Sequence, residues 1–180
     1  ARQTVLSCAN AGNNDLYTPS ADGSFYYDGG DMQHHGALGP MAPYNAGAVG
    51  AAVASALGIE VAYRSPHLAA GAVMTPAAYA GFLRKLMLDQ LALGPMLGTS
   101  PICTNPKTCP SALSAPIPSS ESWHYSIGHW IEDDPVQGDG SFSSPGATGF
   151  YPWVSADRRL YGIVAQDNST LAPATVHWSA

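Results

Sequence analysis

Residues 123–132, with the sequence WHYSIGHWIE, decide the fold of this chain. Their side chains alternate in character with a period of two, which predicts a β-strand. A Gly-Asp-Gly run at 138–140 follows and predicts a turn. Two further strands are predicted over 149–154 and 159–166, joined by a turn at 155–158. The second half of the chain therefore predicts an antiparallel meander.

The strongest helix predicted upstream of this meander runs over 76–93. Thr75 is a good N-cap, and Pro76 suits the first helical position because its missing N–H has no partner there. Apolar residues then recur at helical spacing until Gly94 and Pro95 stop the pattern.

Two other helices are predicted nearer the N-terminus. One runs over 46–57, where Gly58 suits the position after the last turn, and a weaker one runs over 30–41. Helices followed by an antiparallel sheet predict an α+β fold. A length of 180 residues suits a single domain spanning 1–180.

The composition limits the functions that the chain can have. Seven Lys and Arg stand against thirteen Asp and Glu, for a net charge of −6, so we expect no nucleic-acid partner. No stretch approaches the roughly 20 apolar residues that cross a bilayer, so we expect no membrane span. A small-molecule substrate is compatible with such a surface.

The cysteines predict one disulfide. Cys103 and Cys109 enclose a short turn-rich loop, TNPKT, that a disulfide would close, although two free thiols are the alternative. A disulfide predicts a secreted or periplasmic protein. No other cysteine would then remain in this sequence to form a disulfide with Cys8.

Three ordered regions of the sequence, made up of five stretches, resemble the β-lactamase and DD-peptidase superfamily of serine hydrolases, most closely its class C-like and esterase branch. GSFYYDGG resembles the region around the family's Tyr-x-Asn motif, and LAAGAVMTPAAYAGFL resembles the stretch where a helix starts after Thr or Ser. The stretches WHYSIGHW, FSSPGATGFYPWV and RRLYGIVA resemble the family's C-terminal sheet. In chain order these stretches are 23–30, 68–83, 123–130, 142–154 and 158–165. The resemblance implies the C-terminal part of a β-lactamase-like fold.

The resemblance implies that Tyr27 relays a proton during attack on an acyl carbon. A phenol acts as a base only when a nearby cation lowers its pKa, and in the family a lysine does so. Simple packing of Tyr27 is the alternative. Gly29 stands where the family has Asn, so the substrate would meet a glycine without an amide side chain.

A second implied site element is the family's Lys-Thr-Gly edge strand, which Ser144, Pro145 and Gly146 match. No cation stands there, and the glycine would let substrate lie close to the strand. The backbone N–H of Ala147 is expected in an oxyanion hole, and Thr148 is expected beside the substrate. An ordinary Ser-Pro-Gly turn is the alternative.

The nucleophile of such an enzyme is absent from this sequence. The family uses a Ser-x-x-Lys motif, and the nearest approach is Thr-Asn-Pro-Lys at 104–107, inside the expected disulfide loop. We therefore expect a separate segment or chain to supply serine and lysine, and this chain alone to be inactive. The substrate expected is a small ester, amide or lactam, cleaved through an acyl-enzyme without a cofactor. A catalytically inactive binding or structural module is the alternative.

Two other groups of residues were open to more than one interpretation. A metal site is conceivable because four possible ligands cluster within eight positions, although we expect none to bind metal; these are Asp28, Asp31, His34 and His35. Aromatic residues of the predicted sheet could line a cleft or pack in the core; they are Trp123, Trp130, Tyr151 and Trp153. Strand alternation also predicts that one of His129 and Trp130 faces solvent or a cleft.

Overall fold

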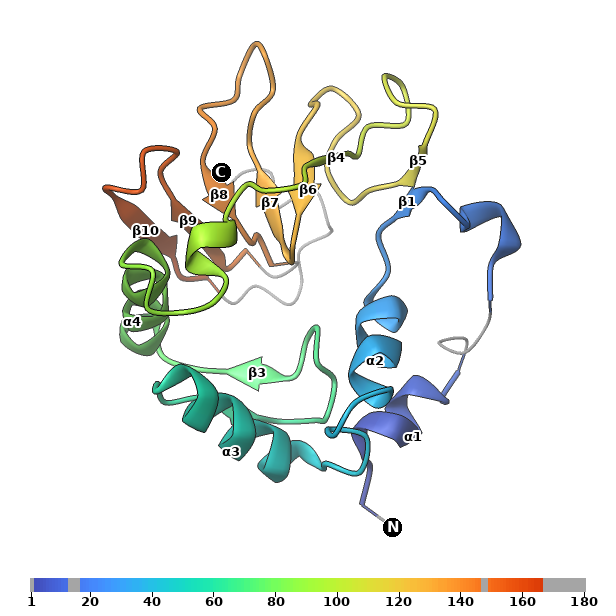
Figure 1. The fold of residues 1–180 in the computed structure, drawn as a ribbon, viewed down its shortest axis with the longest axis vertical. Helices are drawn as coiled ribbons and strands as arrows, with labels where there is room; N and C mark the ends of the chain where they lie inside the picture. The colour runs from blue at the N-terminus through green and yellow to red at the C-terminus, as the bar shows by residue number, and fades with distance from the viewer. Residues whose placement is uncertain (1, 13–16, 147–148, 167–180) are drawn as a thin grey trace. The chain divides into compact units, whose positions relative to one another are not determined.

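The computed structural model describes residues 2–12, 17–146 and 149–166, and it confirms an α+β fold (Figure 1). The chain divides into two compact units, each of which is described here by itself. The first unit is Ala1–Pro19 with Asp28–Tyr79, and the second is Ser20–Tyr27 with Ala80–Ala180. The prediction of one domain is not decided by this division and stays a prediction.

The first unit holds three helices and a two-stranded antiparallel sheet. Its elements are α1 (Val5–Ala9), α2 (Gly29–Ala37), α3 (Ala46–Leu57), β2 (Ala62–Tyr63) and β3 (Ala72–Val73). The buried side chain of Gln33 joins three of its segments. Its Nε2 donates to the carbonyl oxygens of Val5 at 3.0 Å and Pro66 at 2.9 Å, and its Oε1 accepts from the backbone N–H of Leu68.

The helix predicted over 46–57 is confirmed as α3. Asn45 caps it by accepting from the backbone N–H of Ala48 at 3.1 Å, and Gly58 ends it at a φ of 60°. The weaker helix is α2, which ends at Ala37 rather than at residue 41. Asp28 caps α2 by accepting from the backbone N–H of Gly30 at 2.7 Å.

The second unit is built on a six-stranded antiparallel sheet with the strand order β10-β9-β8-β7-β6-β4. From β6 to β10 each strand pairs with the next along the chain, which confirms the predicted meander. The strands are β4 (Ile102–Cys103), β6 (His124–Ser126), β7 (His129–Ile131), β8 (Phe142–Ser143), β9 (Tyr151–Val154) and β10 (Tyr161–Val164). A separate pair, β1 (Phe25–Tyr26) and β5 (Ala112–Ser114), is parallel.

The prediction of one strand over 123–132 is wrong in one respect, because the segment is a hairpin. Strands β6 and β7 pair in the register Tyr125↔Trp130 and Ser126↔His129, and only two residues join them. Gly128 adopts a φ of 71°, a left-handed conformation that glycine reaches without a steric penalty. The alternating pattern continued through this turn and concealed it.

The helix α4 (Pro76–Met87) begins as predicted but ends six residues before position 93. Thr75 caps it by accepting from the backbone N–H of Ala78 at 3.1 Å. Asp89 has a φ of 53°, which turns the chain away from the helix. The short 3₁₀ helix η2 (Gly94–Met96) contains the Gly-Pro pair that was predicted to end α4.

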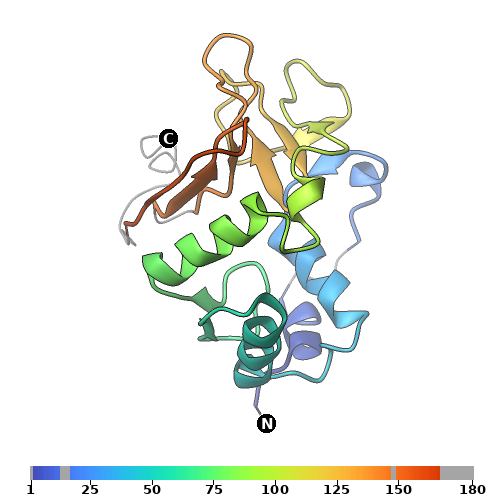
Figure 2. The same cartoon turned by 60° about the vertical axis from the view of Figure 1, so that its left-hand side comes forward.

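Arg158 holds the end of α4 in place. Its guanidinium donates to the carbonyl oxygens of Leu86 at 3.4 Å and Gly94 at 2.6 Å and pairs with the carboxylate of Asp89. The carbonyl of Leu86 belongs to the last turn of the helix, where carbonyls lack partners within the helix. The helix lies beside the β9–β10 hairpin that carries Arg158 (Figures 1 and 2).

None of the helices in the described parts of the chain has the length and apolar character that a bilayer span requires.

We expect Arg158→Met to lower the free energy of unfolding by about 1–3 kcal/mol, because buried carbonyls would lose charged hydrogen-bond donors. Arg159→Met is the matched control, since Arg159 is the exposed neighbour and should change stability by less than about 0.5 kcal/mol. Urea unfolding followed by tryptophan fluorescence measures both. Equal losses in the two variants would contradict the role of Arg158.

Candidate functional site

Tyr27 lies directly after β1 and packs in an aromatic cluster on one face of the sheet. Its backbone N–H donates to the carbonyl oxygen of Ser114 at 3.1 Å. Its ring centroid lies 5.4 Å from that of Trp130 and 5.7 Å from that of Tyr125. Burial raises the pKa of Tyr27, and burial together with Tyr27 raises the pKa of Tyr125 to about 12. A phenol that accepts a proton needs a lowered pKa, so the shift of Tyr27 is in the opposite direction.

Ser144, Pro145 and Gly146 continue from β8 into the connection to β9. The backbone N–H of Ser144 donates to the carbonyl oxygen of Pro152 at 3.1 Å, and that of Gly146 donates to Phe150 at 2.8 Å. Strand β8 itself lies inside the sheet, between β7 and β9. Its pairing with β7 ends at Ser143, so among the described residues the segment from Ser144 onward is held from the β9 side.

Three other residues were predicted around this site. Ala147 and Thr148 are outside the described residues, so the structure says nothing of the oxyanion hole or of the contact predicted for Thr148. Gly29 is the first residue of α2 and belongs to the other unit.

Tyr27 and the Ser144–Gly146 segment belong to the same unit and are linked through one pair of residues. Trp130, which contacts Tyr27, pairs across the strands with Ser143. Paired residues project from the same face of a sheet. Tyr27 therefore lies over the strand that neighbours the one leading into Ser144.

A cavity of about 470 Å³, which the sequence did not predict as a site, opens on this same face of the sheet. The strand register explains its walls, because Trp123, Glu132, Tyr151 and Trp153 fall on the face that carries Trp130. Neither Tyr27 nor the Ser144–Gly146 segment lines it. The cavity is lined by Glu121, Trp123, Glu132, Gln137, Gly138, Asp139, Ser141, Tyr151 and Trp153.

Glu132 is a buried acid that lines the cavity. Its carboxylate accepts a hydrogen bond from the Tyr151 hydroxyl at 2.6 Å. Burial raises the pKa of Glu132 above its ordinary value of 4.5. The hydroxyls of Ser143 and Tyr151 oppose this shift, while the nearby carboxylates of Asp139 and Glu121 add to it. Burial and the bond to Glu132 also raise the pKa of Tyr151.

The loop after β7 is held by Asp134. Its carboxylate accepts from the backbone N–H groups of Val136 at 2.9 Å, Gln137 at 3.0 Å and Ser122 at 2.8 Å. These bonds lower the pKa of Asp134. Gly138 closes the loop so tightly that a Cβ there would lie 2.3 Å from the carbonyl oxygen of Glu132. The loop thus brings Gln137, Gly138 and Asp139 to the cavity.

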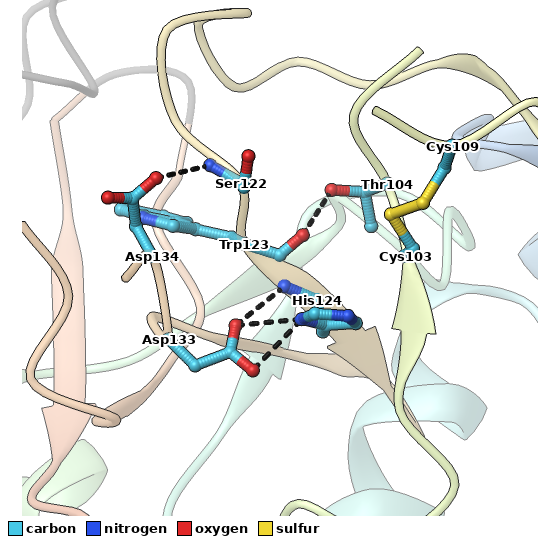
Figure 3. Close-up of polar contacts among 8 residues, drawn as sticks. All are labelled: Cys103, Thr104, Cys109, Ser122, Trp123, His124, Asp133 and Asp134. Atoms are coloured by element: carbon cyan, nitrogen blue, oxygen red, sulfur yellow. Dashed lines mark hydrogen bonds and ion pairs between the residues drawn. A yellow bond between two sulfur atoms is a disulfide. The ribbon is translucent and has the colours of Figure 1, made fainter. Parts of the chain in front are cut away.

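The part of the wall that contains Glu121 and Trp123 is held by the disulfide loop. Cys103 and Cys109 form the predicted disulfide, with their Cα atoms 6.2 Å apart. Within the loop, the hydroxyl of Thr104 donates to the carbonyl oxygen of Trp123 at 2.6 Å, as Figure 3 shows. The buried amide of Asn105 donates to the carbonyl oxygen of Glu121 at 2.9 Å. Two positions of the Thr-Asn-Pro-Lys sequence therefore anchor the cavity wall.

The four residues considered for a metal, Asp28, Asp31, His34 and His35, belong to the first unit. Asp28 is engaged as the N-cap of α2. Nowhere in the described residues do three or more His, Cys, Asp or Glu side chains gather in a way that could hold a metal ion. His124 pairs with the exposed carboxylate of Asp133 at 2.9 Å (Figure 3).

The prediction that one of His129 and Trp130 faces solvent or a cleft is wrong, because both are buried and neither lines the cavity. The Nε2 atom of His129 accepts from the backbone N–H of Gly98 at 3.0 Å, while its Nδ1 contacts the carbonyl oxygen of Ile127 at 3.0 Å. These contacts fit a neutral imidazole with its proton on Nδ1, and burial lowers the pKa of His129. The segment containing Gly98 covers the face of the sheet opposite to Trp130. This segment is a connecting loop without a periodic sequence pattern, so the burial of His129 beneath it was not predictable.

The aromatic residues divide between the two interpretations left open. Trp130 is core, whereas Trp123, Tyr151 and Trp153 line the cavity. The alternation over 123–132 predicted one strand, in which Trp123 and Glu132 would face opposite sides. The hairpin instead brings both side chains to the same face of the sheet.

No family model matches this chain, and no match to it was found among curated proteins or solved structures.

The raised pKa of Glu132 predicts a pH dependence of stability. A carboxyl whose pKa is higher in the folded state stabilises the fold below its ordinary value of 4.5, and this contribution is lost as pH rises through the folded pKa. We expect Glu132→Gln, which stays neutral and still accepts the bond from Tyr151, to gain stability relative to the wild type as pH rises from about 4 to about 8.

Urea unfolding of both proteins across that pH range measures the difference. Glu60→Gln is the control, because it removes the same charge from an exposed position of the other unit. A difference that stays constant with pH would contradict the raised pKa of Glu132.

Proposed function

We propose that this chain contributes the proton relay and the substrate-binding segment of a β-lactamase-like serine hydrolase. The reaction is hydrolysis of a small ester, amide or lactam through an acyl-enzyme, with serine and lysine supplied by a segment outside this sequence. The observation that carries the proposal is the placement of Tyr27 against Trp130, whose cross-strand partner Ser143 directly precedes Ser144.

Each group has a defined part in the proposed reaction. The phenolate of Tyr27 accepts the proton of the incoming serine, and the ammonium of the incoming lysine stabilises that phenolate. Without that cation the phenol stays protonated, which agrees with the pKa that burial raises. The proposal therefore requires the relay to be switched on only when the lysine-bearing segment docks.

The Ser144–Gly146 segment seats the substrate in this proposal. Its β9 side is bonded to Phe150 and Pro152, which leaves the other side of its backbone for a ligand. A Cβ at Gly146 would come within 3.2 Å of the carbonyl oxygen of Phe150, so glycine permits the close contact of this segment with β9. Since no basic residue stands at 144–146, the proposal favours neutral substrates over carboxylates.

A catalytically inactive binding module is the second candidate function. Two observations favour it: the pKa of Tyr27 is raised rather than lowered, and a cavity with aromatic and acidic walls lies apart from Tyr27. This candidate predicts ligand binding without turnover in every combination of segments.

We expect Tyr27→Phe, in the enzyme completed by its Ser-x-x-Lys segment, to lower kcat/KM for a p-nitrophenyl ester by about 10²-fold or more, because general-base assistance is lost. Tyr26→Phe is the matched control, since Tyr26 is the exposed neighbour and should keep full turnover. Thermal unfolding of both variants checks that the fold is kept. Unchanged turnover in Tyr27→Phe would refute the relay.

The same material tests the imported nucleophile. We expect a fluorophosphonate probe to label the completed enzyme on the serine of the added segment and to leave this chain alone unlabelled. Labelling of a serine within this chain would show that the nucleophile is already here. Absence of labelling and turnover in the completed protein would favour the binding module.

A further inference from the structure

The cavity on the sheet face combines a usable volume with an unusual set of walls. Its volume of about 470 Å³ lies within the roughly 300–1,000 Å³ typical of small-molecule sites. Three aromatic side chains line it, Trp123, Tyr151 and Trp153. All the lining residues belong to the second unit, so the cavity does not depend on how the two units are arranged.

The charges of the cavity are of one sign. Glu121, Glu132 and Asp139 line it, and none of its described lining residues is Lys, Arg or His. Glu121 and Glu132 are both about nine-tenths or more buried, with exposed fractions of 4% and 9%. Carboxylates in so dry an environment disfavour one another unless a cation joins them.

The chemistry of these walls selects a class of ligand. Carboxylates form strong hydrogen bonds with ammonium groups, and aromatic side chains attract organic cations through their ring faces. A bare metal ion fits less well, because the described residues hold no cluster of three metal-ligating side chains. An organic cation can use both the carboxylates and the aromatic walls at once.

We propose that this cavity binds a small organic ammonium ion, with its charged group against Glu132 and Glu121 and its carbon body against Trp123, Tyr151 and Trp153. The site is independent of the proposed hydrolase reaction, because neither Tyr27 nor the Ser144–Gly146 segment lines the cavity. The carboxylate of Glu132 already accepts the Tyr151 hydroxyl, which orients it for the ligand.

The probe for this site is benzylammonium, titrated into the full chain and followed by tryptophan fluorescence and calorimetry. We expect saturable binding with one site per chain. Benzyl alcohol, which has the same ring and no charge, should bind at least about tenfold more weakly, because it lacks charge-assisted hydrogen bonds. D-glucose serves as a neutral polyol and should not bind.

The carboxylate is tested by a matched pair of neighbouring substitutions. Glu132→Gln should weaken benzylammonium about tenfold or more while keeping the bond to Tyr151. Asp133→Asn removes the same charge from an exposed position that faces His124, and it should bind the probe within about twofold of the wild type. Glu121→Gln is a second test of the cavity and should also weaken the probe.

Three results would overturn the proposal. Equal affinity for benzyl alcohol would show an apolar cavity without charge recognition, and saturable binding of glucose alone would show a polyol site. Equal weakening by Asp133→Asn and Glu132→Gln would show general attraction to the acidic protein rather than binding in the cavity.

Discussion

The pairing of Tyr125 with Trp130 across the β6–β7 hairpin is the constraint on which the second unit depends. The two-residue turn at Ile127 and Gly128 fixes that register, and a slip by one residue would send every side chain of the strand to the opposite face. With the observed register, Trp130 contacts Tyr27, Phe25 and Trp123. The same register turns Glu132 toward Tyr151. Both candidate sites are therefore consequences of one short turn.

Local signals in the sequence predicted the helices α2, α3 and α4 and the regions of β6, β7, β9 and β10, but not the short strands β1 to β5 or β8. Helix caps depend on local sequence. Gly58 and Thr75 therefore end and begin their helices as predicted, and Asn45 is of a residue type that favours the N-cap position it occupies. The end of α4 was not predictable, because it depends on Asp89 and on Arg158, a residue 72 positions away from the carbonyl that it binds. The hairpin was missed because its turn residues continued the alternating pattern.

In the candidate site, too, features formed by residues close in sequence were predicted and features formed by distant residues were not. The disulfide followed from spacing alone. The cavity instead needs Glu121 from the segment before β6, which Asn105 of the disulfide loop holds, together with Glu132 just after β7 and Asp139 from a turn. Resemblance directed attention to Tyr27, but the burial that raises its pKa comes from neighbours about 100 positions later in the chain. A single sequence does not reveal such convergence, because no periodic pattern marks residues that meet through long-range pairing.

The disulfide loop has a consequence for how this unit assembles. Cys103 and Cys109 are only six positions apart, so their crosslink closes a short loop and does not require the sheet to exist first. Thr104 and Asn105 inside this loop donate hydrogen bonds to the backbone just before β6. The oxidised loop can therefore hold the start of the first strand of the meander. Oxidation of these two thiols would thus give the chain a local template against which the remaining strands can pair in order.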